Sequence, residues 1–365
     1  MLIKEIHLST LKIPLLRPFI TALRRTEYVE DIVVSIVTDC GQIGYGSAAA
    51  TPAITGDSKG AIINALSILG GLLLGKSLAN FTGLIELIQS SLINNTSAKA
   101  ALDIALHDLI AKKLNIPLYQ FLGGEEKTLT TLTTISLKDI PAMCTDAKLF
   151  VSQGFETLKI KVGLNPLEDL ARLKAIREAV PEVSIIADAN QGWDAKSACQ
   201  LIEGVQKQEL NIAVLEQPVK AWDLANLKYL RDKSLIPIYA DEAIFNLRDA
   251  TNILHGQIAD GLNLKLMKSG GIYNTRAIYD LALAYNTPCM AGCMLESPIA
   301  LTAMASFVSG RKNIKFIDLD PITMLKENPV VGGVKAKDAK LTLSDKPGLG
   351  IESIANLEPI LINKD

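Results

Sequence analysis

Five short polar segments recur along the chain, each at the end of an apolar, β-rich run. They are Lys159-Ile-Lys161, Asp188-Ala-Asn190, Glu216-Gln-Pro218, Asp241-Glu242 and Lys265-Leu-Met-Lys268-Ser-Gly-Gly271. The steps from Lys161 to Asp188, Glu216, Asp241 and Lys265 are 27, 28, 25 and 24 residues. One strand, one helix and two short loops of an eight-stranded barrel take about 30 residues. The spacing therefore predicts one polar cluster per βα unit.

Strands and helices alternate along the chain after Gly123-Gly124. Amphipathic helical stretches such as 139–153 and 167–180 separate the strand-like runs, and this alternation favours a parallel sheet. Eight runs are enough to close a barrel. They cover residues 129–137, 157–162, 184–187, 212–215, 236–240, 261–266, 288–291 and 314–319.

The first third of the chain has a different pattern. Residues 3–13, 31–39 and 42–47 are β-rich and predict an antiparallel sheet, and residues 58–122 predict helices. Strands followed by a run of helices indicate an α+β domain. The stretch from Pro321 is loop-rich and has no eighth full helix, so we expect it to pack back on the first domain. The predicted boundaries are 1–124, 125–320 and 321–365.

Charge and hydropathy exclude several classes of partner. The net charge of −2 gives no footprint for nucleic acid or for an anionic membrane. The longest apolar stretch, about 61–75, is too short to span a bilayer, and the first residues carry no apolar signal segment. The five cysteines are scattered and odd in number, which fits thiols in a reducing compartment better than a disulfide framework. We therefore predict a cytoplasmic protein.

Three acids occupy consecutive positions of the polar series. Asp188, Glu216 and Asp241 follow neighbouring strands, and the C-terminal ends of barrel strands meet at one mouth. Oxygen ligands without Cys or His favour Mg²⁺, with Mn²⁺ as a substitute. The sequence therefore predicts a magnesium site between these carboxylates.

Two lysines flank the acids. Lys161 lies on the second strand and Lys265 on the sixth, and these positions are opposite each other in an eight-stranded ring. Bases on opposite faces of a substrate can remove a proton from one side of a carbon and return one to the other, while Mg²⁺ stabilises the enolate. A lysine is a base only when it is neutral, so its pKa must fall. Lys159 shares a face with Lys161, and its like charge acts in that direction.

The ordered set Lys-x-Lys, Asp-x-Asn, Glu-Gln-Pro, Asp-Glu and Lys-x-x-Lys-x-Gly-Gly covers nearly the whole chain and resembles the enolase superfamily, in its muconate-lactonizing subgroup. The resemblance implies an α/β fold, a (β/α)₇β barrel with an N-terminal α+β capping domain completed by the C-terminal segment. It also implies an essential Mg²⁺, removal of a proton α to a carboxylate, and a homo-oligomer. It makes Asp188, Glu216 and Asp241 the metal ligands and Lys161 and Lys265 the acid/base pair.

The resemblance implies roles for five further residues. Lys159 matches a group that binds the substrate carboxylate and stabilises the enolate. Asn190 and Glu242 match residues that support the metal ligands. Glu296 matches a position near the developing oxyanion, and Thr134 matches a position near the substrate.

The segment Phe316-Ile-Asp318-Leu-Asp320-Pro321 resembles the Asp-x-Asp of dipeptide epimerases, which hold a free α-ammonium group. Carboxylates two residues apart share a face of a strand, so Asp318 and Asp320 form a cation site at the mouth. They would repel the dianionic substrate of a cycloisomerase, and an N-acylated substrate offers them no cation.

The segment Pro18-Phe-Ile-Thr-Ala-Leu-Arg24, predicted as a loop of the cap, resembles the specificity loop of L-Ala-D/L-Glu epimerases. In that resemblance Arg24 binds the side-chain carboxylate of a glutamyl residue, for which a bidentate guanidinium is suited. Arg25 is adjacent and is the alternative. The resemblance therefore implies a small dipeptide as substrate and the interconversion of L-Ala-L-Glu and L-Ala-D-Glu.

Three alternatives remain at this point. One is an N-acylamino acid racemase or o-succinylbenzoate synthase of the same subgroup. Another is a metal-free aldolase that forms a Schiff base on Lys161 or Lys265. The third is a catalytically silent barrel that serves as a binding protein.

Overall fold

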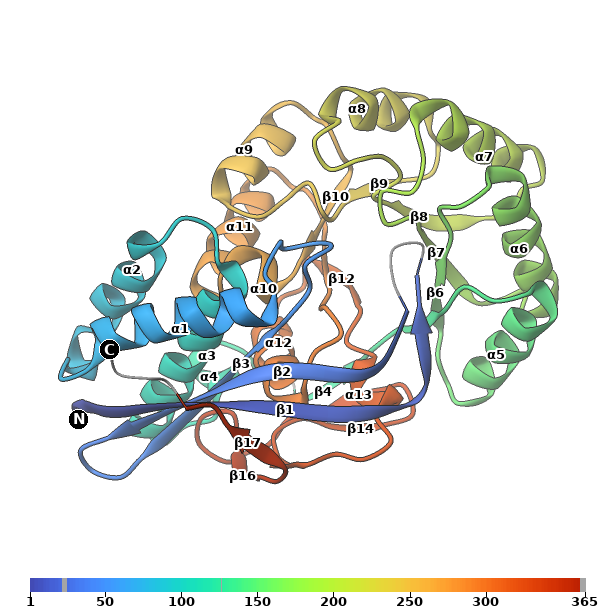
Figure 1. The fold of residues 1–365 in the computed structure, drawn as a ribbon. Coiled ribbons are helices and arrows are strands. Elements are labelled where there is room, and N and C mark those ends of the chain that lie inside the picture. The colour runs from blue at the N-terminus through green and yellow to red at the C-terminus, as the bar shows by residue number, and fades with distance from the viewer. Residues whose placement is uncertain (22–24, 126, 362–365) are drawn as a thin grey trace.

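The computed structural model describes residues 1–21, 25–125 and 127–361. The N-terminal part is a four-stranded antiparallel sheet in the order β17-β1-β2-β3, with helices packed on it (Figure 1). The strands are β1 (Ile3–Ile20), β2 (Arg25–Thr38), β3 (Ile43–Ala49) and β17 (Leu357–Pro359). The helices are α1 (Lys59–Leu73), the 3-10 turn η1 (Leu78–Asn80), α2 (Phe81–Ser91), α3 (Thr96–Lys113) and α4 (Leu118–Phe121).

The sheet of this capping domain is buried on both faces, and β2 shows why. Its side chains alternate, so Ile32 and Val34 join the apolar core beneath the capping helices, whereas Val29 and Val33 join the core shared with the barrel. Asp31 has the same parity as Val29 and Val33 and therefore points toward the barrel. The cap is thus built to contact the barrel through one face of its sheet.

The second part is a sheet of eight parallel strands in the order β12-β11-β10-β9-β8-β7-β6-β5. The strands are β5 (Thr133–Ile135), β6 (Thr157–Lys161), β7 (Ser184–Asp188), β8 (Ile212–Glu216), β9 (Ile238–Ala240), β10 (Gly261–Leu264), β11 (Cys289–Ala291) and β12 (Ile314–Ile317). The helices are α5 (Ile140–Ser152), α6 (Pro166–Ala179), α7 (Ala195–Lys207), α8 (Leu224–Lys233), α9 (Leu247–His255), α10 (Leu266–Ser269), α11 (Ile272–Ala284), α12 (Pro298–Val308) and α13 (Pro321–Met324).

Hydrogen bonds between the segments at the first and last strands join the two ends of this sheet. The Leu132 N–H donates to the Ile317 carbonyl at 2.8 Å, and the Thr134 N–H donates to Asp320 Oδ2 at 2.5 Å. Because α13 is a single turn, no full helix follows β12. The predicted (β/α)₇β barrel under an α+β cap is therefore confirmed.

Two predicted elements differ from the structure. The single strand predicted at 129–137 is two strands, and its first part, β4 (Thr128–Thr130), pairs outside the barrel with β15 (Lys340–Thr342), next to β14 (Lys335–Lys337). The loop predicted at 18–24 begins as strand, because β1 continues to Ile20 and pairs there with Arg25 at the start of β2. In the first case pairing with a distant segment divides the local β pattern, and in the second the adjacent strand β2 extends it.

The C-terminal segment returns to the cap, as predicted. Its strand β17 adds to the edge of the cap sheet beside β1, and β13 (Val330–Gly332) pairs with β16 (Ile351–Ile354). The exact boundaries of the three parts stay a prediction. In the described part of the chain, no helix is long and apolar enough to cross a bilayer. The five cysteines are free thiols, as expected, but only Cys289 is buried, Cys40 is exposed and the other three are partly buried.

Candidate active site

Register brings the first three groups of the polar series side by side at the C-terminal edge of the sheet. Lys161 on β6 is the register partner of Asp188 on β7, and Asp188 is the partner of Glu216 on β8. Asp241 follows directly after β9, the next strand. The side chains of all four residues are buried. The predicted row of acids therefore lies at one end of the barrel.

The two flanking lysines bind opposite ends of this row. Lys161 Nζ lies 2.6 Å from Asp188 Oδ2, and Lys265 Nζ lies 2.6 Å from Asp241 Oδ2. Lys161 ends β6 and Lys265 follows β10, with three strands between them in the sheet. The predicted opposition of the two lysines thus agrees with the strand order.

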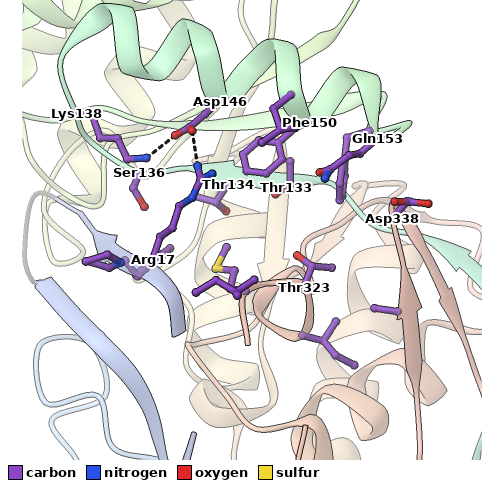
Figure 2. A pocket seen from close by; sticks show the side chains of 18 residues that line it. Arg17, Thr133, Thr134, Ser136, Lys138, Asp146, Phe150, Gln153, Thr323 and Asp338 are labelled. Carbon is purple, nitrogen blue, oxygen red and sulfur yellow. Dashed lines mark hydrogen bonds and ion pairs between the residues drawn. The ribbon is translucent and has the colours of Figure 1, made fainter. Parts of the chain in front are cut away.

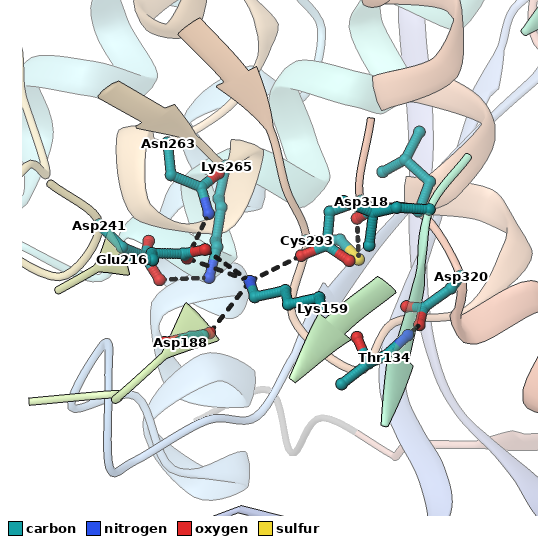
Figure 3. A network of polar contacts seen from close by, with 12 residues as sticks. Thr134, Lys159, Asp188, Glu216, Asp241, Asn263, Lys265, Cys293, Asp318 and Asp320 are labelled. Carbon is teal, nitrogen blue, oxygen red and sulfur yellow. Dashed lines mark hydrogen bonds and ion pairs between the residues drawn. The ribbon is translucent and has the colours of Figure 1, made fainter. Parts of the chain in front are cut away.

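Lys159 lies at the centre of the polar network (Figure 3). Its ammonium is 2.8 Å from Asp318 Oδ2, 2.9 Å from Glu216 Oε2 and 3.0 Å from Asp188 Oδ2. The side chain is almost fully buried, so these ion pairs are protected from water. Lys159 therefore joins the acid row to Asp318, which follows β12.

Two further residues contact the acids and were given no role from the sequence. Lys268 is bound to Asp241 Oδ1 at 2.5 Å, and Asn263 donates from Nδ2 to Glu216 Oε1 at 2.8 Å. Asn263 lies two residues before Lys265, so strand parity could have placed it on the same face. Lys268 was part of the lysine motif, but its position on α10 gives no sequence signal for a contact with Asp241, which follows β9.

The donor chemistry of the row fits a hard divalent cation. Asp188, Glu216 and Asp241 offer only carboxylate oxygens on adjacent strands, which suits Mg²⁺. In the part of the chain that the structure describes, no three acidic, histidine or cysteine side chains form a preformed cage. Each of these three carboxylates is bound to a lysine. Binding of a cation would therefore require the ammonium groups to move off the acids.

The carboxylates at the two ends of the row stay ionised. Burial alone would raise the pKa of Asp188, but the ammonium groups of Lys159 and Lys161 lower it to about 2. Lys265 and Lys268 likewise outweigh burial and hold the pKa of Asp241 well below its ordinary value. In the middle, burial and the charge of Asp188 raise the pKa of Glu216 to about 8. Protonation is therefore favoured for Glu216 at the centre of the row, whereas Asp188 and Asp241 at its ends carry negative charge.

The expectation that the lysine pKa falls is wrong for Lys265 in this arrangement. Burial alone would lower the pKa of Lys265, but the adjacent Asp241 carboxylate raises it above its ordinary value. The pKa of Lys159 is raised in the same way by Asp188 and Asp318, against the effect of burial. The physical reason is that these lysines act here as counterions of the acids.

A second acidic group lies at the mouth, formed by Asp318 and Asp320. Both are buried, and both line a cavity with Lys159, Lys161 and Lys265. Burial and the neighbouring Asp318 carboxylate raise the pKa of Asp320 to about 7. Only Asp318 is paired with a lysine, so this end of the cavity has room for a further positive charge.

Thr134 also lines this cavity, and its role near the substrate stays a prediction. It is the register partner of Lys159 on β6, and its N–H is the donor to Asp320. Phe19 and Ile54 of the cap and Cys293 after β11 also line this cavity. It is therefore enclosed by both parts of the molecule.

Asn190 and Glu242 lie beside the acid row, and their supporting role stays a prediction. Asn190 Oδ1 accepts from Lys161 Nζ at 3.0 Å, and its Nδ2 donates to Glu242 Oε1 at 3.3 Å. Burial and the charge of Asp241 raise the pKa of Glu242 to about 7. Asn190 thus connects a catalytic candidate, Lys161, to Glu242.

Glu296 is not brought to the cavity. Its Oε1 accepts the Met294 N–H at 2.6 Å within its own loop, and burial raises its pKa to about 8. Its role beside an oxyanion stays a prediction. Arg24 lies outside the described residues, and the alternative, Arg25, is exposed and pairs with Glu27 at 3.2 Å.

A larger cavity of about 450 Å³ lies beside β5 and α5 (Figure 2). Three of its charged groups are bound to each other, because Asp146 binds Arg17 at 2.8 Å and Lys138 at 2.5 Å. It contains none of the residues of the acid row. The chemistry therefore lies in the smaller, lysine-lined cavity.

Comparison with known proteins agrees with this geometry. The sequence profile "Mandelate racemase / muconate lactonizing enzyme, N-terminal domain" matches residues 5–123, and "Enolase C-terminal domain-like" matches residues 142–355. An acid row between two lysines in such a capped barrel defines an isomerase of the racemase and epimerase class. The chain belongs to the mandelate racemase/muconate lactonizing enzyme family of the enolase superfamily.

Three relatives show how close the similarity is. A protein of Clostridium acetobutylicum named L-Ala-D/L-Glu epimerase is 41% identical and aligns over 98% of this chain and 100% of its own length. A substrate-liganded complex of the L-Ala-D/L-Glu epimerase from Bacillus subtilis has a TM-score of 0.95 at 42% identity, covering 97% of this chain and 100% of its own. A dipeptide epimerase from Enterococcus faecalis, complexed with Mg and L-Leu-L-Tyr, has a TM-score of 0.93 at 36% identity, with the same coverage.

Proposed function

We propose that this protein is a Mg²⁺-dependent dipeptide epimerase that inverts the α-carbon of the C-terminal residue, with L-Ala-L-Glu and L-Ala-D-Glu as its substrate pair. The observation that carries the proposal is the pairing of two sites in one cavity. Lys161 and Lys265 flank the acid row, and Asp318 and Asp320 lie at the mouth. The names of the relatives support the same reaction.

The cavity has a charge for each end of a dipeptide. Asp318 and Asp320 are suited to the N-terminal ammonium, because they are buried, adjacent and matched by a single lysine. The substrate's terminal carboxylate would lie at the acid row, next to Lys159. Arg24 in the cap is assigned to the glutamyl side chain, for which its planar fork of donors is suited.

Asp188, Glu216 and Asp241 would hold the Mg²⁺. When bound there, a divalent cation supplies the positive charge that stabilises the substrate carboxylate as it takes on enolate character. Binding would also release Lys161 and Lys265 from their carboxylate partners. Asn190 and Glu242 would then keep the acids and Lys161 in position through the hydrogen bonds they make.

The two lysines would carry the proton. In one direction the neutral Nζ of Lys161 takes the α-proton, the C–H electron pair moves toward the carboxylate, and Lys161 becomes an ammonium. The ammonium of Lys265 then donates a proton to the opposite face of the α-carbon and becomes neutral. The reverse reaction exchanges the two roles, so protons and charge balance in both directions. Lys159 would compensate the charge that develops on the carboxylate.

An N-acylated substrate fits the cavity less well. N-acylamino acid racemases and o-succinylbenzoate synthases act on compounds that have no ammonium, which would leave Asp320 buried without a cationic partner. A Schiff-base aldolase would have no use for three converging acids. A silent binding protein would need neither opposed lysines nor an acid row.

A library of dipeptides and N-acylated amino acids, incubated in D₂O with Mg²⁺ and followed by mass spectrometry, tests this function. We expect deuterium uptake at one carbon-bound position, strongest for L-Ala-L-Glu and L-Ala-D-Glu and absent for the acylated compounds. Uptake by the acylated compounds alone would refute dipeptide epimerisation. Uptake by cationic or hydrophobic dipeptides but not by Ala-Glu would refute the assignment of Arg24.

A further inference from the structure

The short turn that carries Lys265 is held from outside the barrel by the capping domain. Asp103 of α3, a capping helix, accepts the N–H of Ile272 on Oδ1 at 2.6 Å, at the first residue of α11. Its Oδ2 accepts the N–H of Tyr273 at 3.4 Å. Asp103 is fully buried, and His107, one turn later, lies 3.2 Å from the same Oδ1. A buried carboxylate at a helix N-terminus is a favourable and directional contact.

Gly271 shows how close this contact is. It has φ +116°, and a Cβ built on it would lie 2.3 Å from Asp103 Cγ. A side chain at this position would therefore collide with the carboxylate and would also strain the backbone. The second glycine of the Lys-x-x-Lys-x-Gly-Gly motif is thus explained by the approach of Asp103.

A second side chain of the cap holds the residue on the other side of Gly271. Gln89 of α2 donates from Nε2 to the Gly270 carbonyl at 2.7 Å. Asn274 of α11 donates in turn to Gln89 Oε1 at 2.9 Å and to the Ser269 carbonyl at the same distance. The junction between α10 and α11 is therefore held from two capping helices.

The junction is connected to Lys265 by one turn of helix. Lys265 precedes α10, and its carbonyl accepts the N–H of Ser269 at 3.2 Å. The N–H groups of Gly270 and Gly271 both donate to the Leu266 carbonyl, at 3.0 and 2.9 Å. A shift at Gly271 would therefore move the backbone of Lys265 rather than be absorbed by a flexible loop.

We propose that Asp103 is a positioning residue for Lys265, through which the capping domain sets the placement of one of the two proton-transferring lysines. This inference rests on the proposed function. Asp103 touches neither the cavity nor the acid row, so it acts through the α10–α11 junction alone. Lys161, on β6, has no such contact with Asp103.

Asp31 provides a matched control. It also belongs to the cap and is fully buried, and its Oδ2 accepts the N–H of Ser297 at 2.9 Å, the residue that caps α12. The contact is of the same kind, but the loop before α12 carries no lysine of the proton transfer. Loss of the Asp31 contact therefore disturbs the cap–barrel interface without acting on Lys265 alone.

The test compares the two epimers separately in D₂O, because each lysine serves one face of the α-carbon. The variants are Asp103→Ala, Asp103→Asn, Gly271→Ala and the control Asp31→Asn, all assayed as the full chain with Mg²⁺. We expect Asp103→Ala and Gly271→Ala to slow α-deuterium uptake from the epimer that Lys265 serves by about 10–100-fold, the size of effect expected from a small misplacement. The other epimer should still take up deuterium at the α-carbon with its configuration retained, because Lys161 still removes a proton and returns a deuteron to the same face.

Asp103→Asn keeps an acceptor oxygen for Ile272 and is expected to have a smaller effect than Asp103→Ala. Asp31→Asn should change both epimers by the same factor. Equal slowing of both epimers by the Asp103 and Gly271 variants, or no slowing, would overturn the positioning role. Absence of exchange with the unmodified protein and every dipeptide would instead overturn the proposed function.

Discussion

Lys161 at the end of β6 and Lys265 directly after β10 bind the first and the last acid of one buried row, each at 2.6 Å, and three strands lie between β6 and β10. Each ammonium is therefore held at the acids from its own side of the barrel. A planar enolate formed between them would present one face to each lysine. This relationship separates a two-base proton transfer from a single-base exchange and is the basis of the predictions below.

Replacing either lysine removes one half of the transfer. Lys161→Ala and Lys265→Ala are each expected to lower the epimerisation rate by at least the ~10²–10⁴-fold that a positioned general acid or base contributes. Circular dichroism and thermal unfolding check that the variants are folded. Near-normal turnover by either variant would show that one base serves both faces.

Removal of the metal is expected to abolish activity, and Mg²⁺ should restore it. Binding can be measured without turnover, by titrating the metal-free protein with Mn²⁺ and following the free ion by electron paramagnetic resonance. Glu216→Gln removes one of the proposed ligands and should weaken Mn²⁺ binding by more than the ~10–100-fold that loss of a supporting residue costs. Unchanged Mn²⁺ affinity in Glu216→Gln would place the ion elsewhere.

Asp320 is expected to select the free N-terminus. Asp320→Asn should lower kcat/KM for L-Ala-L-Glu by about 30-fold or more, because the substrate ammonium loses a buried charged partner worth about 2 kcal/mol or more. The same variant should discriminate less against N-acetyl-L-Ala-L-Glu than the unmodified protein does. If discrimination between the free and acetylated substrates is unchanged, the carboxylates after β12 do not bind the ammonium.

Adjacent arginines allow the side-chain assignment to be tested with a matched control. Arg24→Leu should raise KM for L-Ala-L-Glu by about 10-fold or more, since the glutamyl carboxylate loses a charge-assisted pair, and should have little effect on L-Ala-L-Leu. Arg25→Leu is the control and should leave both substrates unaffected, because Arg25 pairs with Glu27 at the surface. The opposite result would assign the side chain to Arg25.

Much of the barrel and its site could be predicted because both depend on local patterns. Period-two burial on a strand and one polar cluster per βα unit bring Asp188, Glu216 and Asp241 together without knowledge of tertiary contacts. In the structure Asp241 binds Lys265, and the adjacent Glu242 accepts from Asn190.

What the pattern did not reveal depends on contacts between distant segments. Residues 128–130 have the composition of a barrel strand but pair with the C-terminal strand β15, which no local signal identifies. The side chain of Glu296 turns into its own loop, because a nearby backbone N–H is available to it. Asp103 looks like one polar residue within a helix, and only the tertiary structure places it against Gly271.

The pKa values of the lysines also depend on contacts that the sequence pattern does not reveal. From the sequence, Lys159 and Lys161 are like charges that lower each other's pKa. In the fold, the pKa of Lys159 is raised because Asp188 and Asp318 are its ion-pair partners, and the pKa of Lys265 rises because Asp241 is its direct partner. Neighbours along one strand could be predicted from the sequence, but the direction of the Lys265 pKa shift depends on Asp241, which follows a different strand.

The most direct test of the two-lysine transfer follows the isotope in a single conversion. L-Ala-L-Glu is incubated with the Mg²⁺-loaded protein in D₂O, and the first L-Ala-D-Glu formed is analysed by mass spectrometry and proton NMR. Transfer between opposed lysines predicts one deuterium at the α-carbon of the glutamyl residue in nearly every product molecule, because the donating lysine carries solvent deuterium. Product that retains the original α-proton would contradict the two-lysine mechanism.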